Sequence, residues 1–154
     1  MTESRRLLSV MVLHGPNLNL LGTREPDVYG TLTLEEVDRR IADRAASKGI
    51  QVRSFQSNIE GELVDAIQDA TRWADGIVIN AAGYSHTSVA IRDAIAAVDV
   101  PAVAVHLSNP AAREEFRHSD LVAGVCWGVI SGFGWVSYVL ALDVLADRPA
   151  RGSR

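Results

Sequence analysis

Short runs of consecutive apolar residues alternate along this chain with stretches whose apolar positions recur every three or four residues. The runs VMVL, GIVINA and AVAVHL are continuously apolar, which is typical of parallel β-strands that are covered on both faces. The spaced pattern is typical of helices that bury one face. Regular alternation of the two patterns predicts βαβ units with right-handed crossovers.

The pattern predicts the positions of the individual elements. The predicted strands are Leu7–His14, Gln51–Gln56, Gly76–Ala81, Ala102–Leu107 and Val122–Ile130. The predicted helices are Leu34–Ser47, Ile59–Trp73, Ser88–Val98, Ala111–Phe116 and Phe133–Ala146. Capping boxes mark two helix starts, Thr33 with Glu36 and Ser57 with Glu60.

These elements predict an α/β fold, namely a flavodoxin-like, doubly wound, five-stranded parallel sheet of order 2-1-3-4-5 in a three-layer αβα arrangement. We expect a single catalytic domain over residues 1–154, with residues 1–6 and 148–154 as frayed tails.

Composition narrows the class of protein. Apolar residues make up 47% of the chain and charged residues 22%, which is ordinary for a soluble globular domain. The formal net charge of −4 argues against nucleic-acid and membrane partners. No apolar stretch approaches the roughly 18 residues of a membrane span, and no signal-peptide cleavage site follows the first apolar run, so we expect a cytoplasmic protein. Cys126 lies in an apolar run and is interpreted as a buried thiol.

Lys48 is the only lysine in the chain, and it lies at the end of a predicted helix, next to a capping glycine. A Schiff-base enzyme or a Walker-type phosphate loop would need a lysine elsewhere. Both classes are therefore excluded.

Polar side chains follow the predicted strands where ligands bind in doubly wound sheets, beyond the carboxyl ends. The first strand leads to Asn17, the second to Asn58, the third to Asn80 and the fourth to His106. We therefore expect a functional site at this edge of the sheet.

The segment HGPNLNLLGTREPDVYGTLT, which follows the first strand, is long enough to be a functional lid. It carries Arg24 and Tyr29. A cation close to a tyrosine favours the phenolate, so this pair can supply a base. Taken alone, however, the segment is better explained by a tyrosine that anchors the loop and a solvated arginine.

Two further segments carry candidate residues. NAAGYSHTSVAIRDAI contains Asn80 at a strand end and then His86, which could equally be a capping or loop histidine. VHLSNPAAREEFR contains His106, followed by Arg113 and Arg117. The two arginines are four residues apart, so on a helix they would share one face and could meet an anion, unless the neighbouring glutamates pair with them.

Four blocks, GPNLNLLGTREPDVYG, QSNIEGELVDAI, NAAGYSHTSVAIRDAI and HLSNPAAREEF, together closely resemble the signature segments of the type II 3-dehydroquinate dehydratases, in the same order and spacing. The resemblance runs from about Val10 to Leu145. It implies a flavodoxin-like fold and trimers assembled into dodecamers. It also implies elimination of water from 3-dehydroquinate, which gives 3-dehydroshikimate, with neither a metal nor an organic cofactor.

The resemblance also implies roles for individual residues. Tyr29 is the base that removes the proton α to the ketone, and Arg24 holds it as the phenolate. Asn17 helps to hold the water that stabilises the enolate oxygen, and His106 is the acid that protonates the departing hydroxyl. Asp93 reaches the site of a neighbouring subunit. The residues implied in substrate binding are Asn80, His86, Leu107, Ser108, Arg113 and Arg117.

The sequence departs from the family pattern at several positions. Ala104 stands where the family usually has a glutamate that orients the catalytic histidine, so we expect His106 either to find another partner, such as Asn17 or a water, or to work with a lower pKa. Ala111, Asp120 and Ser137 replace a usual His, Ser and Gly, and we expect these changes to affect packing or assembly.

Other functions stay open at this stage. One is a paralogue with weak or altered dehydratase activity, and another is a non-enzymatic, flavodoxin-like module that binds a small ligand. The role, in shikimate biosynthesis or in quinate catabolism, also stays open.

Overall fold

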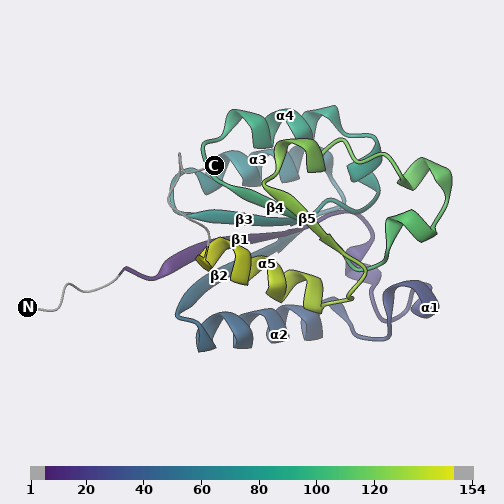
Figure 1. Ribbon diagram of the computed structural model, residues 1–154, viewed down its shortest axis with the longest axis horizontal. Coiled ribbons are helices and arrows are strands. Elements are labelled where there is room, and N and C mark those ends of the chain that lie inside the picture. The colour runs from purple at the N-terminus through teal and green to yellow at the C-terminus, as the bar shows by residue number, and fades with distance from the viewer. Residues whose placement is uncertain (1–5, 148–154) are drawn as a thin grey trace, which may run out of the picture.

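A computed structural model of the chain describes residues 6–147, so most of the predicted frayed tails lie outside the described residues. Five parallel strands form one sheet in the order β2-β1-β3-β4-β5, which confirms the predicted fold and strand order (Figure 1). The strands are β1 Leu8–His14, β2 Ile50–Gln56, β3 Gly76–Asn80, β4 Ala102–His106 and β5 Gly128–Ser131.

Helices cover both faces of this sheet. α2 (Leu34–Ser47) and α5 (Val136–Asp147) pack on one face, and α3 (Glu60–Ala70) and α4 (Val89–Ala97) pack on the other (Figure 1). The short helix α1 (Pro26–Tyr29) lies apart from both layers, in the long connection that follows β1. The helices therefore cover the two faces of the sheet, and the carboxyl ends of the strands are surrounded by loops.

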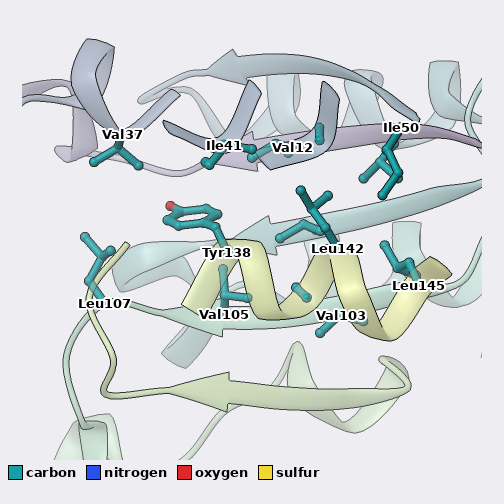
Figure 2. Close-up of a cluster of buried hydrophobic side chains, with 14 of the residues drawn as sticks. Val12, Val37, Ile41, Ile50, Val103, Val105, Leu107, Tyr138, Leu142 and Leu145 are labelled. Carbon is teal, nitrogen blue, oxygen red and sulfur yellow. The ribbon is translucent and has the colours of Figure 1, made fainter. Parts of the chain in front are cut away.

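Side chains alternate across the sheet, and this alternation creates two cores. On β4, Val103 and Val105 join the core beneath α2 and α5, whereas Ala102 joins the core beneath α3 and α4. Figure 2 shows the first of these cores, in which Leu142 of α5 faces the strands. All residues of β3 and β4 are buried, as expected for central strands. Because a strand has a period of two, Ala104 and His106 lie on the same face as Ala102.

A chain of hydrogen bonds crosses the first core. Asn80 Nδ2 donates to the Tyr138 hydroxyl at 3.1 Å, and that hydroxyl lies 2.8 Å from His14 Nδ1. His14 Nε2 lies 2.7 Å from Asp38 Oδ1. A carboxylate only accepts, so Nε2 carries the proton, and the Tyr138 proton is left to bond to Nδ1. His14 and Tyr138 are completely buried, and burial raises the pKa of Tyr138, so its hydroxyl stays protonated.

The predicted elements differ from the structure at several ends. The capping box of Thr33 and Glu36 is confirmed at the start of α2. The second capping box is wrong, because the Ser57 hydroxyl accepts from the Ile59 N–H and Ile59 itself precedes α3. α5 begins three residues later than predicted, since Gly134 has a φ of 59°, which an α-helix does not allow.

Two predicted elements between β4 and α5 are wrong in part. The helix expected over Ala111–Phe116 is replaced by two 3₁₀ turns, with Arg113 in an extended conformation between them. The fifth strand was expected to start at Val122, but β5 starts only at Gly128. The N–H groups of the residues at 122 and 123 donate to the Asp120 carboxylate, which folds this segment into a turn.

Replacing Tyr138 by phenylalanine should destabilise the fold. The variant Tyr138→Phe keeps the ring but leaves His14 and Asn80 each with a buried polar group that lacks its partner. At roughly 1–3 kcal/mol for each of the two unsatisfied groups, the free energy of unfolding should fall by about 2–6 kcal/mol. Urea denaturation followed by circular dichroism, at equal protein concentrations, measures this loss.

The matched control is Tyr84→Phe, because the Tyr84 hydroxyl donates to the Asn58 carbonyl outside the buried core. That substitution should change stability by less than about 0.5 kcal/mol. Equal losses for the two variants would show that the buried chain adds nothing to stability.

Candidate active site

A cavity of about 130 Å³ opens beyond the carboxyl ends of β1, β3 and β4. All of the predicted site residues except Asp93 line it. Its walls are formed by Pro16, Asn17, Leu18, Arg24, Tyr29, Asn80, Ala82, Gly83, His86, His106, Leu107, Ser108, Pro110, Arg113 and Arg117. The topology therefore gathers three separate segments of the chain, those that follow β1, β3 and β4, around one small space.

Close backbone packing forms the floor of this cavity. The Gly15 N–H donates to the Asn80 carbonyl at 2.7 Å, which ties the end of β1 to the end of β3. A Cβ atom at Gly15 would lie 2.5 Å from the Ala81 carbonyl oxygen, so only glycine fits there. Asn80 is held in one orientation, because its Oδ1 accepts from the Ala82 N–H while its Nδ2 donates to Tyr138. One amide N–H of Asn80 is left for a ligand.

The segment after β1 forms the lid of the cavity. Leu18 and Leu21 are buried and anchor it to the core, while Asn17 takes a left-handed conformation with a φ of 70°. The sequence pattern gave no sign of helix α1, which is a single turn and carries Tyr29 at its end. The lid therefore presents Tyr29 toward the strand ends from a loop that is fixed at its base.

Two guanidinium groups contact the ring of Tyr29. The Cζ atom of Arg24 lies 4.9 Å from the ring centroid, and that of Arg113 lies 5.1 Å from it. Arg24 comes from the lid and Arg113 from the segment after β4, so the ring joins the two segments. Both guanidinium groups are therefore close enough to the ring for cation–π contacts.

The segment after β4 brings both predicted arginines to the cavity, although not on a helix. Arg117 Nε lies 2.7 Å from Glu114 Oε2, and Arg113 Nε lies 3.7 Å from the same oxygen. The predicted pairing with a glutamate and the predicted position at the site are thus both observed. Arg113 also donates to the Ser108 hydroxyl at 3.3 Å. These contacts hold two cations at the rim of the cavity.

His86 ends the 3₁₀ turn η2 (Ala82–His86). Its Nδ1 lies 2.7 Å from the Ser119 carbonyl oxygen. A carbonyl only accepts, so Nδ1 carries a proton. When the ring is neutral, Nε2 is then a hydrogen-bond acceptor, as a substrate hydroxyl requires.

His106 is buried at the end of β4 and pairs with Asp120. Its Nε2 lies 2.9 Å from Asp120 Oδ2. The partner of this nitrogen is thus Asp120 and not Asn17, so Asp120 does more than the packing or assembly role that we expected for it. This contact could not be predicted from the sequence, because 14 positions separate the two residues and only the tertiary fold joins them. The one available signal was an added acidic residue in a chain that lacks a carboxylate at Ala104.

Asp93 stands apart from the cavity. It lies on α4 with its side chain exposed, and it does not line the cavity of its own chain. Its predicted contact with a neighbouring subunit stays a prediction.

The described residues give two further findings about the class of protein. Within residues 6–147, no group of three or more histidine, cysteine, aspartate or glutamate side chains is arranged to hold a metal ion. None of the helices in the same range is both long enough and apolar enough to cross a membrane.

Comparison with known proteins gives matches over nearly the whole chain. The sequence profile of the family described as "Dehydroquinase class II" matches residues 8–146. A 3-dehydroquinate dehydratase of Acaryochloris marina is 56% identical over 137 residues, which cover 89% of this chain and 92% of that protein. A protein of the same name from a Nitratiruptor species is 54% identical over 135 residues, which cover 88% and 86%.

A solved structure also matches. The crystal structure of a type II dehydroquinase from Butyrivibrio crossotus superposes with a TM-score of 0.90 and 44% sequence identity, covering 91% of this chain and 98% of that one.

The thiol of Cys126 should be unreactive in the native protein. Burial, together with the negative charge of Asp120, raises its pKa to about 12. At pH 8 only about one thiol in ten thousand is then ionised, and the thiolate is the reactive form. Iodoacetamide followed by mass spectrometry should show slow labelling of the folded protein and fast labelling in urea. Equal rates in the two conditions would contradict this.

Proposed function

The chain belongs to the type II dehydroquinase family, and from this we infer that it is a 3-dehydroquinate dehydratase, a hydro-lyase of the shikimate pathway. It converts 3-dehydroquinate to 3-dehydroshikimate with loss of water. The observation that carries the inference best is the cavity, in which a tyrosine in contact with two arginines and a carboxylate-bound histidine line the same small space. Elimination through an enolate needs a base and an acid, and these residues supply both types.

Tyr29 is proposed as the base. It removes the proton α to the ketone as the phenolate, and the guanidinium groups of Arg24 and Arg113 contact its ring. Asn17 lies on the same lid, and it is proposed to hold the water that stabilises the enolate oxygen.

His106 is proposed as the acid that protonates the departing hydroxyl. It lines the cavity from the end of β4, whereas Tyr29 lines it from the lid. When the C–O bond breaks, its electron pair stays with the oxygen, which takes the histidine proton and leaves as water. The enolate electrons then form the new C=C bond, so the step needs no cofactor.

The remaining lining residues are proposed to bind the substrate. Arg117 offers a cation to the substrate carboxylate. Asn80 offers its free amide N–H, and His86 offers Nε2, to substrate hydroxyls. Ser108 and the backbone of Leu107 complete the contacts at the end of β4.

The protein is also proposed to assemble into trimers and then into dodecamers, with Asp93 reaching the cavity of a neighbouring subunit. The support is the position of Asp93, which is exposed on α4 and absent from its own cavity. In such an assembly one subunit completes the site of the next.

Replacing Tyr29 by phenylalanine should remove most of the turnover. Tyr29→Phe keeps the ring that the two arginines contact and loses only the titratable oxygen, so kcat should fall by about 10² to 10⁴ while KM changes little. The assay mixes purified protein with 3-dehydroquinate and follows the ultraviolet absorbance of the conjugated enone. Tyr84→Phe, the control, should keep most of the turnover, and so should wild-type protein treated with a chelator. Full turnover in Tyr29→Phe would exclude this base.

Subunit complementation tests the assembly. Tyr29→Phe and Asp93→Asn proteins should each be nearly inactive, but oligomers formed by refolding them together should regain activity, because some sites receive an intact residue from each chain. Light scattering should show trimers or dodecamers in every sample. An active monomer, or mixed oligomers without recovered activity, would contradict the role of Asp93.

A further inference from the structure

The pairing of His106 with Asp120 leads to an inference that rests on the proposed function. We propose that Asp120 is the positioning residue for the acid His106, and that it supplies from the loop before β5 the carboxylate that β4 lacks at Ala104. The proposal depends on the geometry of Asp120, on the chemistry of the imidazole and on the position of Ala104.

The Asp120 carboxylate is held at both of its oxygens. Oδ2 lies 2.9 Å from His106 Nε2, while Oδ1 accepts from the N–H groups of Val122 at 3.0 Å and Ala123 at 2.9 Å. The side chains of His106 and Asp120 are only 10% and 19% exposed. A carboxylate fixed by two backbone donors cannot rotate away from the ring, so it fixes the orientation of the imidazole.

The carboxylate stays charged in this position. Burial by itself would raise the pKa of Asp120, but the hydrogen bonds from His106 and from the backbone N–H groups outweigh it and lower the pKa below its usual value. A charged acceptor requires a proton on Nε2 of His106. The nitrogen that remains for the substrate is therefore Nδ1.

This arrangement suits an acid in a specific way. To give a proton from Nδ1 while Nε2 keeps its own, the ring must start as the doubly protonated imidazolium. A carboxylate on Nε2 stabilises that cation, and after the transfer it still holds the neutral ring by the same hydrogen bond. Asp120 therefore acts through His106 and does not itself touch the reacting atoms.

Ala104 explains why the carboxylate comes from the loop. It precedes His106 by two residues on β4 and thus lies on the same face, buried between Ile79 of β3 and Val129 of β5. Its methyl group cannot orient the imidazole. A glutamate at this position would project on the same face as His106. The substitution Ala104→Glu would therefore place a carboxylate on β4 itself.

The first test removes the charge of Asp120. Asp120→Asn keeps an oxygen to accept from Val122 and Ala123, so the turn should persist and the melting temperature should stay close to that of the wild type. The amide nitrogen then faces Nε2 and, as a donor, opposes a proton there. We expect kcat to fall roughly ten- to a hundred-fold with KM within about two-fold. The matched control is Asp75→Asn, since Asp75 also accepts from a backbone N–H and pairs with a side chain, but at the opposite edge of the sheet.

The second test is rescue. Asp120→Ser removes the carboxylate but leaves a hydroxyl that can cap the turn. Its kcat should fall by about as much as that of Asp120→Asn. The double variant Ala104→Glu, Asp120→Ser should have a kcat at least ten-fold higher than that of Asp120→Ser. Ala104→Glu alone should not raise kcat above that of the wild type. A merely structural role of Asp120 predicts no such rescue.

The outcomes separate this proposal from the proposed function. An inactive wild-type protein would exclude the dehydratase itself. Wild-type activity that is unchanged in folded Asp120→Asn, or a loss carried by KM alone, would overturn the role of Asp120. If Asp120→Asn does not fold, the rescue by Ala104→Glu decides, because an unrescued Asp120→Ser protein that is folded would overturn the proposal.

Discussion

The buried hydrogen-bond chain from Asp38 through His14 and Tyr138 to Asn80 is the constraint on which the rest of the structure depends. It joins α2, β1, α5 and β3 in one line of polar contacts within an apolar core. Because each of these hydrogen bonds joins two different elements, the strands cannot shift in register without leaving a polar group unsatisfied. Its inner end is the amide that lines the cavity, so the same contacts that stabilise the layers also set the position of a ligand-binding group.

Much of the fold could be predicted from the sequence because its signals are local. Continuous apolar runs mark the three central strands, and the Thr33 and Glu36 pair marks the start of α2 within the residues that form it. The errors fall where a distant side chain decides the local structure. The Asp120 carboxylate turns the chain at positions that read as a strand, and one left-handed glycine delays α5.

In the candidate site, too, the features with a local signal could be predicted, and the contacts between distant residues could not. That polar residues meet beyond the strand ends follows from the topology of a doubly wound sheet, so the residues at the ends of β3 and β4 could be placed from the sequence. Contacts between loops could not, because they depend on the path of each loop. Neither the contact of Arg113 with the Tyr29 ring nor the bond between Asp120 and His106 has a fixed spacing in the chain. The alanine at position 104 indicated that the partner of His106 differs from the usual glutamate, but it did not indicate which residue takes that place.

The position of the one lysine has a practical consequence. Lys48 follows α2 at the amino end of the sheet, where it pairs with Asp143 of α5, and the cavity opens at the opposite edge. Apart from the amino terminus, it carries the only primary amine of the chain. Coupling through the Lys48 amine, whether to a dye, a surface or a cross-linker, therefore attaches the folded subunit at the end of the sheet that lies away from the cavity.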